Sequence, residues 1–162
     1  MFCLIAFACQ QKQNSLSQIE LKEITSSASV VVQKVFDYSN NMDFETGLTH
    51  YSASAESYFI TDGIMHNLDD LKKAYRAIGP SVEDLENTIE SWNVNVLSED
   101  VVTFTLPVQL RLKLKEIPEY TGKLIWTATL QKQDDEWKIV HSHESWLNCA
   151  AVSAALSPSN DS

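Results

Sequence analysis

Two histidines near the carboxyl end are the residues best suited to chemistry in this chain. His141 and His143 lie two apart in the run 136–146 (EWKIVHSHESW), and side chains two apart on a strand project to the same face of a sheet. A neutral imidazole can donate or accept a proton near neutral pH. We therefore expect both rings to line a cavity, where either could be a general acid or base. Glu144 is expected on the opposite face, in solvent.

Asp62 is the third candidate for catalysis. A carboxylate in an apolar cavity has a raised pKa and can act as a base. However, Asp62 is followed by Gly63, and Asp-Gly is also a common hairpin turn that needs no chemistry. The residues leave both interpretations open, as they leave open a purely structural role for the two histidines.

Aromatic side chains supply the expected walls of such a cavity. Trp126 shares a strand face with the apolar Leu124 and Leu130, so core or cavity wall is predicted for it. Trp92 shares a face with Val94 and Val96, and the same prediction applies to it. With the histidines, the candidate ligand-binding residues are Tyr58, Trp92, Phe104 and Trp126.

Composition narrows the classes of partner. The 162 residues suffice for one domain with a real core, and 22 acidic against 12 basic residues give a net charge of -10. Such a surface repels phosphate backbones and anionic membranes, so nucleic-acid binding is disfavoured. The four histidines show no zinc-type spacing with cysteine, and neither a metal site nor a cofactor is expected.

The first residues form a separate segment. An apolar run ends in Ala8-Cys9 and is followed by polar residues, which resembles a bacterial lipobox. The resemblance implies lipidation of Cys9, export, and anchoring on the periplasmic side of a bacterial envelope. Only eight residues precede Cys9 and none is basic, so the signal would have to begin upstream of Met1. The alternative is a chance apolar tip on a cytoplasmic protein.

Three helices are predicted in the first half. Ser17 and Glu20 form a capping box, after which apolar residues recur every three or four positions as far as residues 40–41. Asp43 is expected to cap a short second helix. Asn67 begins a third, which Gly79 and Pro80 end. Between the last two helices, residues 56–60 and 64–66 form a short hairpin.

Residues 86–148 are predicted to form antiparallel strands. From Val102 to Leu114, seven apolar residues alternate with more polar ones, which indicates one buried face. Pro107 lies within this run and has no backbone N–H to donate, so a bulge or bend is expected there. The domain limits follow as a signal-like segment and linker (1–16), one folded domain (17–149) and a flexible tail (150–162).

The chain resembles the nuclear transport factor 2-like superfamily, and within it the SnoaL-like branch. The matching pieces are YFITDG at residues 58–63, the capped helix after Asn67, Thr121-Gly122, and WKIVHSHES at residues 137–145; the last also resembles the end of the calcium/calmodulin-dependent kinase association domain. The resemblance implies an α+β fold, a cone-shaped half-barrel of a curved, mostly antiparallel sheet with about three helices on its concave face. It also implies a homodimer formed through the sheet.

Function has to be argued from the site, because this fold carries unrelated activities. The interpretation preferred here is a SnoaL-like domain that binds a small, partly apolar ligand in the cone. One alternative is an isomerase, dehydratase or cyclase that uses a cavity histidine or aspartate. The other is a non-catalytic oligomerisation module. Whether the protein is an enzyme stays open.

Overall fold

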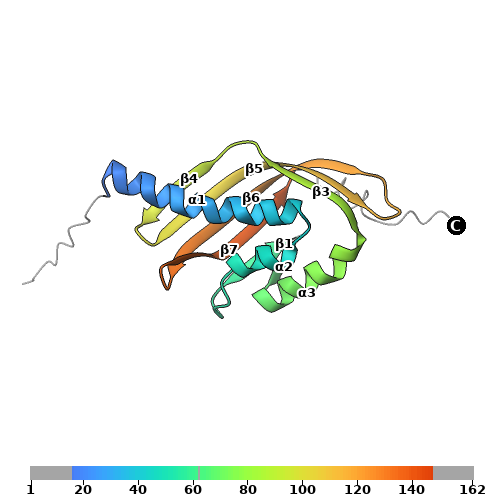
Figure 1. Cartoon of the computed structure of the whole chain (residues 1–162), viewed down its shortest axis with the longest axis horizontal. Helices are drawn as coiled ribbons and strands as arrows, with labels where there is room; N and C mark the ends of the chain where they lie inside the picture. Colours follow the sequence, from blue (N-terminus) through green and yellow to red (C-terminus); the bar gives the residue numbers. More distant parts are fainter. Residues whose placement is uncertain (1–15, 62, 148–162) are drawn as a thin grey trace, which may run out of the picture.

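Helices cover one face of a curved sheet in the computed structural model, which describes residues 16–61 and 63–147 (Figure 1). The expectations for Cys9, for Asp62 and for a flexible tail concern residues outside these ranges. Among the described residues, no helix combines the length and apolar character that crossing a membrane requires.

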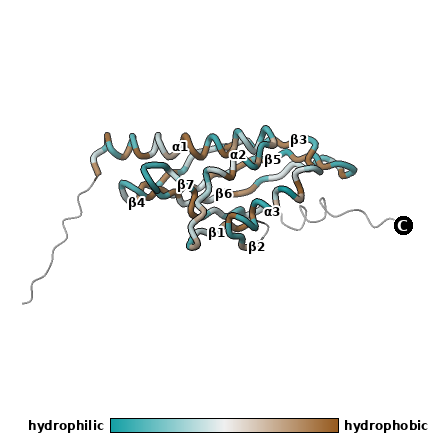
Figure 2. Tube along the Cα trace, turned by 60° about the horizontal axis from the view of Figure 1, so that its bottom comes forward, coloured by the Kyte–Doolittle hydropathy of each residue, from teal (hydrophilic) through white to brown (hydrophobic). Residues whose placement is uncertain are grey.

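The longest helix is α1 (Gln18–Asn40), which begins at the predicted capping box. The backbone amide of Ser17 donates to Glu20 at 2.7 Å, and the amide of Glu20 donates back to the Ser17 hydroxyl at 3.3 Å. Hydrophobic and hydrophilic residues alternate turn by turn along α1 (Figure 2). Its buried stripe repeats every four residues and consists of Ile24, Ala28, Val32 and Phe36.

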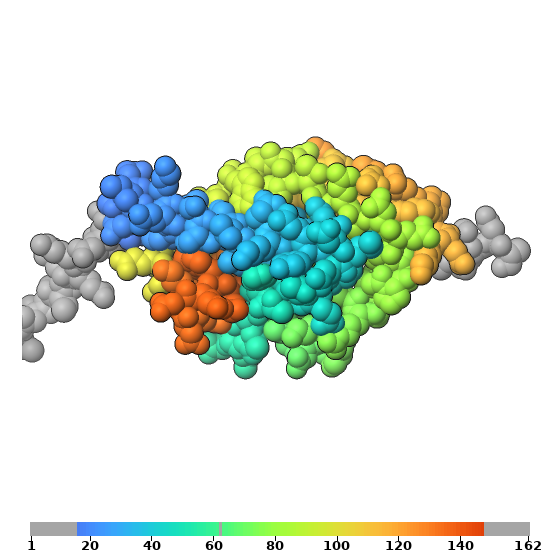
Figure 3. Space-filling model, viewed as in Figure 1, coloured from blue at the N-terminus to red at the C-terminus, as the bar shows by residue number. Residues whose placement is uncertain are grey.

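The other two predicted helices also lie where their caps place them. Asp43 accepts a hydrogen bond from the Thr46 amide and begins α2 (Phe44–Gly47), which continues into the 3-10 turn η1 (Leu48–His50). Asn67 caps α3 (Leu68–Ile78) by accepting from Asp70, and η2 (Gly79–Ser81) follows it. Seen from the helical side, α1 and the segment containing α2 cover the middle of the sheet (Figure 3).

Seven strands within the described part of the chain form one mixed sheet in the order β2-β1-β7-β6-β5-β3, with β4 also paired to β5. All neighbouring pairs are antiparallel except β1 with β7, which run parallel. The third strand begins at residue 82, four residues earlier than expected. The strands are β1 (Tyr58–Thr61), β2 (Ile64–His66), β3 (Val82–Ile89), β4 (Asn93–Ser98), β5 (Val101–Leu114), β6 (Tyr120–Gln133) and β7 (Glu136–Trp146).

The expectation of a bulge at Pro107 is wrong. Pro107 pairs with Ile125 in an uninterrupted register between β5 and β6. Its carbonyl accepts a hydrogen bond from Glu90, which lies where the chain passes from β3 to β4. The N–H and C=O of one strand residue point to the same side of the strand. The N–H that proline lacks would therefore point to the place where the partner of β5 changes from β3 to β4, and no strand hydrogen bond is lost there. The sheet therefore accommodates this proline without a bulge between β5 and β6.

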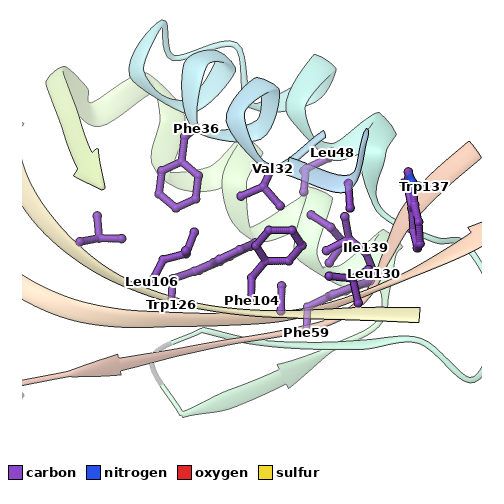
Figure 4. Packing of buried hydrophobic residues seen from close by; sticks show 14 of the residues in the cluster. Val32, Phe36, Leu48, Phe59, Phe104, Leu106, Trp126, Leu130, Trp137 and Ile139 are labelled. Carbon is purple, nitrogen blue, oxygen red and sulfur yellow. The ribbon is translucent and has the colours of Figure 1, made fainter. Parts of the chain in front are cut away.

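The core lies between α1 and the concave face of the sheet. Phe36 and Val32 of α1 point down onto Leu106, Phe104 and Trp126 (Figure 4). The alternating residues of β5 that were predicted to be buried make up much of this layer, from Val102 to Val108. The predicted α+β half-barrel with helices on its concave face is confirmed.

Candidate functional site

A hollow remains between the carboxyl-terminal half of α1 and the sheet. About 70 Å³ of it is open to the centres of water-sized molecules, which is room for a few waters or a compact organic group. Every layer of the fold contributes to its lining, which consists of Val35, Phe36, Ser39, Phe44, Gly47, Leu48, Tyr51, Tyr75, Asn87, Val108, Leu124, Trp126 and Glu144.

Aromatic rings form much of the wall. Phe36 of α1 meets Trp126 of β6 edge to face, with ring centroids 5.3 Å apart. Phe44 of α2 and Tyr75 of α3 form a second pair at 5.0 Å. Tyr51 completes the set and meets the buried ring of Phe59 at 4.9 Å. These contacts hold the rings in fixed orientations around the hollow.

Glu144 is the only charged side chain among the described residues that line the hollow. It lies on β7 directly opposite Trp126 of β6. Burial raises the pKa of the Tyr51 phenol, and the negative charge of Glu144 raises it further, whereas a hydrogen bond with Ser142 acts in the opposite direction. Tyr51 is therefore a neutral hydroxyl at physiological pH, on the same hollow as a carboxylate.

Amide side chains fix the rim on the α1 side. Asn40 of α1 pairs with the backbone of Asn87 on β3, donating to its carbonyl at 3.0 Å and accepting from its amide at 2.7 Å. The side chain of Asn87 donates to Ser39 at 3.2 Å. This network joins the end of α1 to an edge strand and positions Ser39 and Asn87 at the hollow.

A β-bulge decides which residues of β7 face the hollow. Leu130 of β6 lies opposite Ile139, but the adjacent Thr129 lies opposite His141, so Val140 is an extra residue in β7. Up to Ile139 the odd-numbered side chains point to the core, and after Val140 the even-numbered ones do. Ser142 and Glu144 therefore face the helices.

The expectation that His141 and His143 line the hollow is wrong for the same reason. They share a face, as alternation predicts, but it is the convex face, opposite Thr129 and Thr127. The ring of His141 packs on Tyr58 with centroids 4.5 Å apart, and its Nδ1 lies 3.3 Å from the Tyr58 carbonyl oxygen. His141 also borders a separate groove of about 270 Å³ on this side.

The other predicted ligand-binding residues are dispersed. Tyr58 belongs to the convex face with His141, and Phe104 is only 1% exposed within the core. Trp92, which is 39% exposed, precedes β4 and borders a groove between α1 and β3 while touching Phe104 edge-on. Of the predicted set, Trp126 is the residue that lines the hollow.

Sequence reasoning missed the polar groups of the site. Strict alternation along residues 137–145 predicts Glu144 on the solvent face, because it ignores the extra residue in β7. Tyr51 and Tyr75 were visible only as aromatic residues, since nothing local distinguishes a cavity wall from a core position. No cluster of three or more potential metal ligands occurs within residues 16–61 and 63–147.

Comparisons with known proteins agree with this architecture. The family model described as "SnoaL-like domain" matches residues 29–148, most of the chain. None of the curated proteins matches the sequence.

Solved structures share the fold at low identity. A putative scytalone dehydratase from Novosphingobium aromaticivorans aligns with a TM-score of 0.72 at 13% identity, over 80% of this chain and 88% of that one. An NTF2-like superfamily protein from Salmonella enterica aligns with a TM-score of 0.70 at 12% identity, over 78% of this chain and 92% of that one. The CamKII hub homology domain of Chlamydamonas reinhardtii aligns with a TM-score of 0.61 at 17% identity, over 76% of this chain and 98% of that one. At these identities the likeness shows the fold alone.

Proposed function

Because the chain belongs to the SnoaL-like domain family, whose fold carries unrelated activities, we propose its function from the hollow itself: the protein binds a small, partly apolar organic molecule between α1 and the sheet. The observation that carries this proposal is the Glu144 carboxylate in a wall that aromatic and aliphatic side chains dominate.

The lining has the composition of a ligand site. Concave sites for small molecules are mostly apolar, with a few polar groups that fix the orientation of the ligand. Here the apolar contact comes from rings such as those of Phe36 and Trp126, and the polar contacts come from Glu144, Tyr51 and Asn87. A ligand with an apolar body and at least one hydrogen-bond donor satisfies both.

The test is a fragment screen followed by NMR on isotope-labelled protein. Binding in the hollow is expected to shift the indole N–H resonance of Trp126 and to leave the ring signals of His141 and His143 unchanged. Glu144→Gln should weaken binding of the fragments found. His143→Gln, on the neighbouring position but the opposite face, is the matched control and should not. Shifts confined to the convex face would contradict the proposal.

A second candidate function is proton transfer, the enzyme alternative with a different residue as base. Glu144 lies on the same hollow as the neutral phenol of Tyr51, and a base beside a hydrogen-bond donor is an arrangement used in acid–base catalysis. A generic probe is 5-nitrobenzisoxazole: removal of its ring C–H proton breaks the N–O bond and releases a coloured cyanophenolate. Wild-type turnover faster than the reaction in buffer, and lost in Glu144→Gln, would favour this function. Equal rates for the wild type and Glu144→Gln would exclude Glu144 as a base toward this probe.

A further inference from the structure

We propose that the hollow selects a small organic cation, such as a compact quaternary or primary amine, with Glu144 as its counter-ion. The inference rests on the proposed function and names the class of ligand. It follows from the sign of the charge in the hollow and from the kind of surface that surrounds it.

The charge of the lining has one sign. Among the described residues that line the hollow, Glu144 is the only aspartate, glutamate, lysine, arginine or histidine. The basic residue that follows Tyr75 on α3, Arg76, forms an ion pair with Glu45 and borders a different groove. The net charge of the chain, -10, has the same sign. A cation entering the hollow therefore meets attraction at long and short range, whereas an anion meets repulsion.

The rings supply the second half of the argument. Phe36, Phe44, Tyr51, Tyr75 and Trp126 all border the hollow, and they come from α1, α2, the residue after η1, α3 and β6. The face of an aromatic ring carries partial negative charge, so it attracts a cation within about 6 Å of its centroid, and tryptophan does so most strongly. Several rings with one carboxylate solvate an alkylammonium group better than a neutral group of the same shape.

The hollow has room for a compact head group. About 70 Å³ of it is open to the centres of water-sized molecules, which leaves space for a trimethylammonium-sized group. Glu144 lies opposite Trp126, so a cation between the rings and the carboxylate would contact both.

The experiment compares two probes that differ in charge alone. Choline and its neutral carbon isostere, 3,3-dimethylbutan-1-ol, have the same shape, and each is titrated into the full-length protein while the Trp126 indole resonance is followed. Choline is expected to bind at least about tenfold more tightly. Glu144→Gln should reduce that ratio toward one. Glu136→Gln, a charge change on the exposed start of the same strand, should preserve it.

A second pair of variants keeps the test valid if Glu144→Gln fails to fold. Tyr75→Leu should lower the preference for choline, and Tyr75→Phe, which keeps the ring, should retain it. Equal affinity for the two probes overturns the cation inference and leaves the ligand-binding proposal standing. Absence of choline binding up to tens of millimolar also overturns it, and the fragment screen then decides separately whether the hollow binds neutral or anionic molecules.

Discussion

Glu144 and Tyr51 line the same hollow, and the negative charge of the first raises the pKa of the second. They come from segments far apart in the sequence. Tyr51 is held at Ile139 of β7 by a parallel bridge, and Glu144 follows on that same strand beyond the bulge. The position of the carboxylate relative to the phenol therefore depends on one strand and on the extra residue within it.

The raised pKa of Tyr51 predicts a loss of stability in alkali. A phenol in the unfolded chain ionises near pH 10, whereas the folded protein keeps Tyr51 protonated at higher pH. The contribution of Tyr51 to the free energy of unfolding is thus fully present below about pH 10. It is lost as the pH rises above that value, by about 1.4 kcal/mol per pH unit. Urea unfolding of wild type and Tyr51→Phe from about pH 8 to about pH 11 should show a shallower decline for the variant. Parallel declines would mean that Tyr51 ionises normally.

The bulge at Val140 predicts that this one residue can be removed without exchanging the faces of β7. Deleting Val140 joins Ile139 directly to His141, so regular alternation keeps His141 and His143 on the convex face and Ser142 and Glu144 toward the helices. We therefore expect the deletion to keep the fold and to cost about 0.5–3 kcal/mol in thermal and urea unfolding. Val140→Ala keeps the extra residue and should cost about 1 kcal/mol or less. A loss above about 4 kcal/mol for the deletion alone would show that β7 needs the bulge itself.

Phe36 is predicted to support both the core and the hollow. It is 7% exposed and packs edge to face on Trp126. Phe36→Ala should lower the free energy of unfolding by about 3–5 kcal/mol, because it removes apolar burial and leaves a cavity next to the hollow. Val30→Ala, on an exposed position of the same helix, should change it by about 0.5 kcal/mol at most. Chemical denaturation measures both, and a loss below about 1 kcal/mol for Phe36→Ala would contradict the packing described.

The pairing of Asn40 with Asn87 predicts a local effect at the rim. Asn40→Ala removes a donor and an acceptor from the backbone of β3, which should cost about 1–3 kcal/mol and speed hydrogen exchange at the Asn87 amide. Asn40→Asp keeps the acceptor for the Asn87 amide and loses the donor. Hydrogen exchange at the Asn87 amide should therefore stay slower in Asn40→Asp than in Asn40→Ala. Unchanged exchange in Asn40→Ala would show that the pairing does not protect β3.

Homodimer formation through the sheet stays a prediction, and the convex face offers a place for it. Tyr58 and Met65 leave apolar surface exposed there, and Ile125 lies on the same face between Pro107 and Ser145. Ile125→Glu should convert a dimer into a monomer in sedimentation experiments. Ile64→Glu is the matched control, since Ile64 is exposed on the same hairpin as Met65 but with the opposite orientation. A wild-type monomer at high concentration would refute the prediction.

Several features of the site follow from local sequence. Ser17 with Glu20, Asp43 and Asn67 mark three helix starts, because a cap requires only neighbouring residues. Trp126 can be placed on the inner face because it lies at even spacing from the apolar residues Leu124 and Leu130. Glu144 cannot, because its face depends on how β7 pairs with β6, and pairing is a property of two strands.

The helix limits, the buried face of β5 and the α+β class can be derived from local sequence, since each depends on caps and periodicity within a short window. That a carboxylate and not an imidazole enters the hollow follows only from the pairing of β7 with β6 in the folded protein. The physical reason is parity: on a strand of period two, one extra residue exchanges the two faces, and nothing in the residues around Val140 marks it. The hollow was likewise decided in three dimensions, because its wall is assembled from helices and strands that meet only when the sheet curves around α1.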